Sequence, residues 1–421
     1  MWRLDAECGD RRAAGESGIG CGGGIGMIAG GHGRPACLGW FDGMIDRCHA
    51  HVEAAKAGGR PIVGIMCEYT PRELILAAGG VPICLCGGSA ARIPAAEEHL
   101  PANLCPLIKS TFGYHVEKSN PFLEWADLVV AETTCDGKKK MFELMGESRP
   151  MHVLALPHRP DGAGLERWEQ EMRRLVAELE GRFKVKITAG KIRDAIRLMN
   201  RERRLRREIG GLMRRDDPPL TGRELLGLKS IVSGIPEDIA RYEEILEELA
   251  RADGIGATDR VRVLLTGVPV VHGAERVVDL IEDHGGLIVC QENCTGLKPI
   301  LDDVDEAADD PIAALAKKYF DIPCSVMTPN DGRMASLRRL VAEFRPACVI
   351  ELIWQACLTY DVESARVRRL VQEELGLPYL RIETDYSPSD SGRIAVRVEA
   401  LFELVRARGT AGRAGTQRGV E

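Results

Sequence analysis

The sequence predicts an α/β protein with two lobes, each built on a parallel sheet, that face each other across a cleft and are joined by a helical connector. Short β-type runs alternate with helix patterns from about residue 38 and again after Gly254. The stretch between is rich in Arg, Glu and Leu at helical spacing and has almost no β-type run. Because buried strands that alternate with helices form parallel sheets with both faces covered, we expect two Rossmann-like lobes.

Apolar runs predict the strands of each lobe. In the first lobe the runs cover 61–66, 81–85, 126–131 and 151–155, and in the second they cover 261–265, 287–290, 347–353 and 379–382. After the first run, Thr70 is expected to cap a helix, with Pro71 at its first position and Glu73 completing a capping box. Ligands of open parallel sheets bind beyond the carboxyl ends of the strands. Two such lobes would therefore face their strand ends across the cleft.

Composition shifts divide the chain into five segments. The first and last are rich in Gly and Arg and are predicted to be disordered. The segments are a leader at 1–36, an N-terminal α/β lobe at 37–184, a helical connector at 185–258, a C-terminal α/β lobe at 259–406 and a tail at 407–421.

The charge balance disfavours several classes of protein. The 421 residues hold 56 Lys and Arg against 63 Asp and Glu, a net charge of −7, which offers no basic field to a nucleic acid. No apolar run approaches the roughly 20 residues that cross a bilayer, and the N-terminus lacks a basic stretch followed by an apolar one. We expect a cytoplasmic protein, neither secreted nor embedded in a membrane.

The 14 cysteines need an explanation, because a cytosolic chain of this size does not pair them as disulfides. No CxxC is present, and only Cys84-Leu-Cys86 and the wider Cys290/Cys294 pair come near it, so a structural zinc site is a weak interpretation. Any one of them is equally well explained as a small buried hydrophobe. Six, however, fall in polar loops or at predicted strand ends, where clustered thiolates suit an iron–sulfur centre; they are Cys67, Cys105, Cys135, Cys294, Cys324 and Cys357.

Several multi-residue motifs around these cysteines resemble the 2-hydroxyacyl-CoA dehydratase/benzoyl-CoA reductase family, and within it the D-like double-cubane cluster proteins. The resemblance runs from about residue 40 to 405. The motifs are Cys67-Glu-Tyr-Thr-Pro-Arg-Glu-Leu, Asn103-Leu-Cys-Pro-Leu-Ile-Lys, Thr134-Cys-Asp-Gly-Lys-Lys-Lys-Met, Gln291-Glu-Asn-Cys-Thr-Gly-Leu-Lys-Pro and Glu383-Thr-Asp-Tyr-Ser.

The resemblance implies an 8Fe-9S double-cubane cluster, two cubane halves joined by a sulfide and held by six cysteine thiolates. Carried over by motif, the ligands are Cys67, Cys105, Cys135, Cys294, Cys324 and Cys357. The resemblance also implies an anaerobic oxidoreductase that receives low-potential electrons from a separate iron–sulfur ATPase, the activator, and reduces a small molecule. The chain has no phosphate-binding loop of its own.

Alternatives remain open at this stage. The chain could be a 2-hydroxyacyl-CoA dehydratase or aryl-CoA reductase subunit with one 4Fe-4S cluster, or a non-catalytic electron-storage protein. The sequence leaves open which three of the six cysteines bind each half of the cluster. It also leaves open whether Cys84, Cys86 or Cys290 replaces one of the six. A homodimer is expected.

Proton donors are equally open. Glu68, Glu292 and Glu351 lie near the motif cysteines and are weak candidates for a proton relay. Lys138-Lys-Lys140 could tune the cluster, dock the partner or simply form a solvated helix start. Packing or surface roles are favoured for the histidines, which are His152, His158, His272 and His284.

Overall fold

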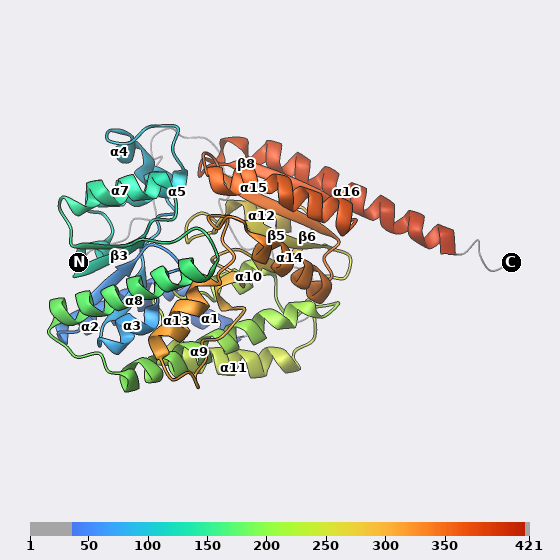
Figure 1. Cartoon of the computed structure of the whole chain (residues 1–421). Coiled ribbons are helices and arrows are strands. Elements are labelled where there is room, and N and C mark those ends of the chain that lie inside the picture. Colours follow the sequence, from blue (N-terminus) through green and yellow to red (C-terminus); the bar gives the residue numbers. More distant parts are fainter. Residues whose placement is uncertain (1–35, 417–421) are drawn as a thin grey trace, which may run out of the picture. The chain divides into compact units, whose positions relative to one another are not determined.

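The computed structural model describes residues 36–416, with side chains described as far as Arg408. Within them, eight strands form two parallel four-stranded sheets (Figure 1). The first has the order β2-β1-β3-β4 and consists of β1 (Ile62–Ile65), β2 (Val81–Cys84), β3 (Leu128–Glu132) and β4 (Met151–Leu154). The second has the order β6-β5-β7-β8 and consists of β5 (Val261–Gly267), β6 (Gly286–Glu292), β7 (Cys348–Trp354) and β8 (Tyr379–Thr384).

The helices of the N-terminal half precede, connect or follow its strands. In chain order they are η1 (Ala36–Leu38), α1 (Gly39–Asp42), α2 (Met44–Ala57), α3 (Arg72–Ala77), η2 (Ala90–Arg92), α4 (Ile93–Glu97), α5 (Pro106–Glu117), α6 (Pro121–Trp125), α7 (Asp136–Gly146) and α8 (Gly162–Phe183).

Between β4 and β5 the described chain is helical beyond α8. It forms α9 (Ala189–Gly211), η3 (Leu212–Arg214), α10 (Gly222–Gly227) and α11 (Pro236–Arg251), and α9 lies beside α11 in Figure 1. The C-terminal half holds α12 (Arg276–Asp283), η4 (Lys298–Ile300), α13 (Pro311–Phe320), α14 (Asp331–Phe344), α15 (Leu358–Arg369), the π-helical turn η5 (Leu370–Glu374), η6 (Pro388–Asp390) and α16 (Ser391–Thr416).

In the central strands of each sheet both faces are buried, although neighbouring strand residues point to opposite sides. In β1, Ile62 belongs to the core cluster that contains α2 and α7 residues, while Val63 belongs to the cluster that contains Trp168 of α8. In the second sheet, Val263 and Leu264 of β5 divide in the same way between two clusters. Strands covered on both sides lose the polar alternation of a half-exposed sheet, which explains their continuous apolar runs.

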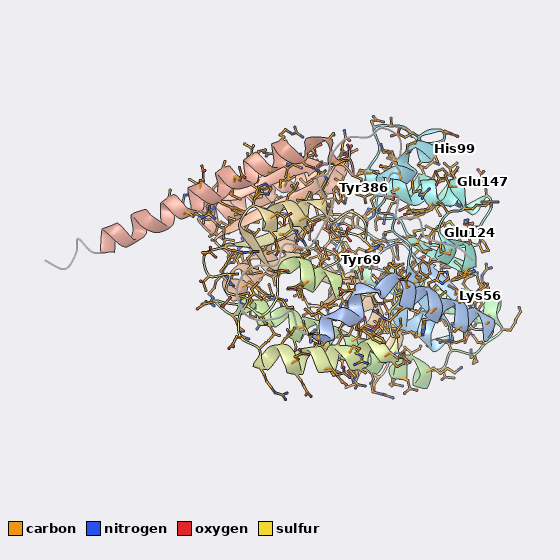
Figure 2. All side chains as sticks on the ribbon, turned by 180° about the vertical axis from the view of Figure 1, so that it is seen from behind. Lys56, Tyr69, His99, Glu124, Glu147 and Tyr386 are labelled. Atoms are coloured by element: carbon orange, nitrogen blue, oxygen red, sulfur yellow. The ribbon has the colours of Figure 1, made fainter. Side chains whose placement is uncertain are left out.

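The two lobes are tied by reciprocal hydrogen bonds. Tyr69 of the N-terminal lobe donates its hydroxyl to the Ile322 carbonyl oxygen at 2.9 Å, and Tyr386 of the C-terminal lobe donates to the Gly87 carbonyl oxygen at 3.1 Å. Both tyrosines are buried, and Figure 2 labels them. At Gly88 the backbones approach so closely that an added Cβ would lie 2.1 Å from the His272 carbonyl oxygen, so glycine alone fits there.

The predicted α/β class with two parallel-sheet lobes is confirmed, and each predicted strand appears. The predicted capping box is wrong. The α3 helix begins at Arg72 with Pro71 at its N-cap and no side-chain capping bond. The Thr70 hydroxyl instead donates to buried Glu132, and Glu73 forms a buried ion pair with Arg203, because partners across the fold offer these groups stronger bonds than the helix end.

The division into five segments stays a prediction. The predicted leader lies outside the described residues except for Ala36, and α16 continues past 407 to Thr416. Across residues 36–416, no helix has the length and hydropathy needed to span a bilayer.

Candidate cysteine-rich site

Five of the six motif cysteines lie beyond the carboxyl end of a strand or at the start of a helix, and Cys324 lies in the loop between α13 and α14. Cys67 follows β1, Cys135 follows β3, Cys294 follows β6 and Cys357 follows β7. Parallel strands bring their carboxyl ends to one edge of a sheet. The described cysteines are all free thiols, and the structure sorts the six motif cysteines into two groups.

The first group, here called the N-cap group, consists of Cys105, Cys135 and Cys357. Each is the N-cap residue of a helix, α5, α7 and α15 respectively. A hydrogen bond between the thiols of Cys105 and Cys357, with help from the Leu107 and Ile108 amides, lowers the pKa of Cys105. Burial raises the pKa of Cys135, and the field of Cys357 adds to that rise. The positive ends of three helices thus converge on this group.

The second group, here called the loop group, consists of Cys67, Cys294 and Cys324. All three lie in turns or irregular segments outside the helices and strands. Burial raises the pKa of Cys67 well above its ordinary value, and the fields of Cys294 and Cys324 raise it further. Burial also raises the pKa of Cys294 to about 12, which the Lys298 ammonium opposes. The Cys67 and Cys294 thiols therefore resist ionisation unless a cation binds them.

The two groups are neighbours. The Ser325 hydroxyl, next to Cys324, lies 3.0 Å from the Thr359 hydroxyl, which itself hydrogen-bonds Cys357. On the other side, the Lys138 ammonium interacts with both Cys67 and Cys135. Each group draws thiols from both lobes, so the lobes must be docked before either group exists.

A cavity of about 520 Å³ reaches the loop group but not the N-cap group. Its wall includes Cys67 and Cys294, whereas none of the N-cap thiols lines it. Most of the remaining wall is apolar, from α1, α2 and the segment after β5. Its charged lining residues are Asp42, Glu68, Lys138, Arg223, Lys229, Glu275 and Asp279, and His272 lies among them. Concave, largely apolar sites with a few polar groups are typical of small-molecule binding.

The predicted carboxylates do not gather at this cavity. Glu68 lines it, but ion pairs of 2.8 Å with Arg72 and with Lys229 hold the pKa of Glu68 at about 2, although burial opposes them. Glu292 and Glu351 are fully buried in the C-terminal lobe, away from the cavity wall. At neutral pH Glu68 therefore holds no proton to give, and the relay role of all three remains a prediction.

Sequence reasoning missed Glu132, the last residue of β3. Its side chain is fully buried, and one carboxyl oxygen has no hydrogen-bond partner among the described residues. Burial raises the pKa of Glu132 to about 8, despite the hydrogen bond from Thr70 and the field of Lys138. The field of Glu132 reaches Cys67. A carboxyl group that keeps its proton at neutral pH is a candidate acid, and only its position three residues before Cys135 could have pointed to it.

The histidines differ in whether they reach the cavity. Of the four considered from sequence, His272 lines the cavity, 3.5 Å from Glu275, whose hydrogen bond raises the pKa of His272. His158 and His284 bond backbone carbonyl oxygens, at 2.8 Å each. His152 is a half-buried residue of β4.

The three alternative cysteines differ in whether they lie near the loop group. Cys290 is buried in β6 within a core cluster that contains none of the six motif cysteines. Cys84 and Cys86 line the cavity; the Arg72 guanidinium approaches the Cys84 sulfur at 3.8 Å, and the Cys86 thiol donates to the Met66 carbonyl oxygen at 3.4 Å. Both therefore stand beside the loop group.

Within residues 36–416, no set of three or more His, Cys, Asp or Glu side chains converges on one point as ligands of a single metal ion do. An iron–sulfur cluster makes a different demand, because each thiolate binds a different iron and the sulfurs stand farther apart. The two adjacent sets of three free thiols fit such a cluster, and the Lys138 and Lys298 ammoniums beside them would offset thiolate charge.

Comparisons with known proteins agree with the family resemblance of the motifs. The model of the family described as 2-hydroxyglutaryl-CoA dehydratase, D-component, matches residues 67–405. A putative dehydratase subunit, YjiM, of Escherichia coli (strain K12) is 42% identical over 361 residues, which cover 83% of this chain and 93% of the relative. The beta subunit of (R)-2-hydroxyglutaryl-CoA dehydratase of Acidaminococcus fermentans is 23% identical over 83% of this chain and 93% of its own. A benzoyl-CoA reductase subunit of Thauera aromatica is 23% identical over 65% of this chain and 72% of its own.

Proposed function

The chain belongs to the 2-hydroxyglutaryl-CoA dehydratase, D-component, family, and from this premise we propose that it is an iron–sulfur reductase that acts on a small molecule in the cavity beside the loop group. The observation that carries the proposal is the adjacency of two three-thiol groups in one chain. One group would suffice for the single 4Fe-4S cubane of the alternative dehydratase subunit. Two adjacent groups favour an 8Fe-9S double cubane.

The proposed ligands are the N-cap group, Cys105, Cys135 and Cys357, for one half and the loop group, Cys67, Cys294 and Cys324, for the other. The sequence motifs left this division open. Such a cluster, when bound, supplies electrons at low potential. The chain supplies the surroundings: three helix N-termini face one half, and buried cations flank the other.

The cavity residues would bind the substrate and exclude water. The Lys229 ammonium donates to Glu68 and to the Cys294 carbonyl oxygen, at 2.8 and 2.9 Å, and so closes the wall beside the loop group. Glu132 would hold a proton near Cys67, and His272 would hold one on the cavity wall. Reduction of a small unsaturated or nitrogenous molecule needs both electrons and protons, and this arrangement would supply both at one cavity.

Two partners belong to the proposal. The electron donor is an ATP-dependent iron–sulfur activator, and the working form is a homodimer. The relatives named above are subunits by name, which supports multi-component operation. The sequence lacks a phosphate-binding loop, so nucleotide hydrolysis would fall to the activator.

The second candidate is a dehydratase or aryl-CoA reductase subunit with one 4Fe-4S cluster. The names of the relatives favour it, above all the 42% identical putative dehydratase subunit. The third, an electron-storage protein, would accept electrons without turning over a substrate.

Iron and acid-labile sulfide in anaerobically purified protein separate these candidates. About eight irons per chain are expected for the double cubane and about four for the single one, and zinc without iron would remove both. With activator, ATP and a low-potential donor, turnover of a small molecule is expected to exceed that with dithionite alone. Equal rates without ATP or activator would contradict the proposed gating, and full reduction with no turnover of any small molecule or acyl-CoA would support electron storage.

A further inference from the structure

The Lys138-Lys-Lys140 run contains one lysine unlike its neighbours. Lys139 and Lys140 pair with Asp136 and Glu143 on α7, and their side chains are 41% and 74% exposed. Lys138 instead turns inward, lines the cavity and donates its ammonium to the Met66 carbonyl oxygen at 2.8 Å. Three identical charges on one helix turn thus occupy two different environments.

Nothing local explains an inward lysine at this position. Lys138 is the third residue of α7, and a cation in the first turn opposes the helix dipole. Burying an ammonium also costs free energy unless anions accompany it. The groups whose fields reach the Lys138 ammonium are Cys67, Cys86, Cys135 and Glu132. Three neutral thiols and a protonated carboxyl group offer little compensation, whereas thiolates at the cysteines would offer a great deal.

The ammonium also stands where the two cysteine groups meet. Cys67 belongs to the loop group and Cys135 to the N-cap group, and both feel the charge of Lys138. A positive charge between two anionic centres stabilises each added electron on either of them, and in low dielectric that effect is large.

We propose that Lys138 is a positioning residue whose ammonium, held by the Met66 carbonyl at the junction of the two cysteine groups, raises the reduction potential of the cluster bound there. This inference rests on the proposed function. It assigns Lys139 and Lys140 no part in setting the potential, although they carry the same charge on the same helix.

The test is a redox titration, followed by EPR, of anaerobically purified full-length protein. Lys138→Met removes the charge and keeps much of the length of the side chain, so its midpoint potential is expected to fall below that of the wild type. Lys138→Arg keeps the charge, so its midpoint potential is expected to stay close to that of the wild type. Lys139→Met is the matched control and should leave the potential unchanged. Equal potentials for Lys138→Met and Lys139→Met, with wild-type iron content in both, would overturn the proposal.

A second variant covers the case in which Lys138→Met assembles no cluster. Lys138→Gln also removes the charge but keeps a side-chain N–H that can donate to the Met66 carbonyl oxygen, so its midpoint potential is expected to fall as in Lys138→Met. If both neutral variants lose iron, Lys138→Arg is expected to keep it. Iron loss in Lys138→Arg as well, or a wild-type potential in Lys138→Gln, would overturn the inference. A wild-type protein that binds no iron would overturn the proposed function instead, so the two failures are distinguishable.

Discussion

The N-cap group takes its three thiols from the first residues of helices, whereas the loop group takes its thiols from turns between elements. Backbone amides and helix ends therefore supply the field around the N-cap group. Around the loop group the field comes from side chains such as Lys298 and Lys229. A field made by backbone persists through most substitutions, but a field made by side chains does not.

The same two regions differ in access. The cavity reaches Cys67 and Cys294 of the loop group and no thiol of the N-cap group. Beside the N-cap group lies α15, in whose first two turns Leu358 and Val362 are 70% and 75% exposed. The loop group is thus on the cavity side and the N-cap group beside a helix that faces solvent, so substitutions in the two groups are expected to have different consequences.

Removing a thiol is expected to have the largest effect. Cys324→Ser in the loop group and Cys135→Ser in the N-cap group should each lower the iron content by roughly half, because a hard hydroxyl replaces a soft thiolate poorly. Substrate reduction should be lost in Cys324→Ser even when the remaining iron is still reduced, whereas Cys135→Ser should chiefly slow electron uptake from the activator. Iron, sulfide and EPR measurements check this. Cys348→Ser, buried in β7, is the control, and iron loss in that variant alone would refute the assignment.

The next effect concerns the ion network behind the loop group. Buried Arg333 pairs with Glu292, Glu351 and Glu363 at 3.4, 3.1 and 2.6 Å, and Asn330 links Glu363 to the Cys324 carbonyl oxygen. Arg333→Met would leave buried carboxylates unpaired, at a cost of about 3–5 kcal/mol in the free energy of unfolding.

A surface ion pair on the same helix provides the control for that substitution. Arg338 pairs with exposed Glu374 at 2.6 Å, and Arg338→Met should cost less than about 1 kcal/mol. Denaturant unfolding measures both variants. Comparable losses would show that the network does not support the loop group.

Glu132 should make the free energy of unfolding depend on pH. The folded state raises the pKa of Glu132 from 4.5 to about 8, so between these values the folded state binds more protons than the unfolded state. Stability from this group is complete below pH 4.5 and is lost as the pH rises to about 8, by up to about 1.4 kcal/mol per pH unit. Glu132→Gln mimics the protonated form and should flatten that loss. Unfolding free energies at about pH 5.5 and about pH 8.5, on either side of most of the expected loss, test this prediction. Exposed Glu143→Gln is the control. Parallel pH profiles of the wild type and Glu132→Gln would count against a protonated Glu132.

The smallest expected effect compares the two lobe-bridging tyrosines. Tyr69→Phe removes the bond to Ile322, two residues before Cys324, and Tyr386→Phe removes the bond to Gly87. Each should cost about 1 kcal/mol, because a carbonyl oxygen loses its partner. Iron release to a chelator should be faster from the loop half in Tyr69→Phe. It should be faster from the N-cap half in Tyr386→Phe, because the wild-type Tyr386 hydroxyl interacts with Cys105. EPR of the partly depleted protein distinguishes the halves, and identical spectra would remove the distinction.

Much of the fold could be predicted because its signals are local. A strand buried on both faces needs a continuous apolar run, and the helices between such runs follow from spacing of apolar residues. The same logic placed Cys67, Cys135 and Cys357 beyond strand ends. The capping box failed because its prediction weighed only neighbours in sequence, whereas Thr70 and Glu73 bond residues far along the chain.

Local sequence patterns were enough to predict the two α/β lobes, their strands and a set of cysteines suited to iron. The docked lobes established how those cysteines group, that Lys138 turns inward while Lys139 does not, and that Glu132 rather than Glu68 keeps a proton. The reason is physical. Apolar periodicity records a side chain's preference along its own element, but the field at a buried group comes from every charge that the docked lobes bring near it.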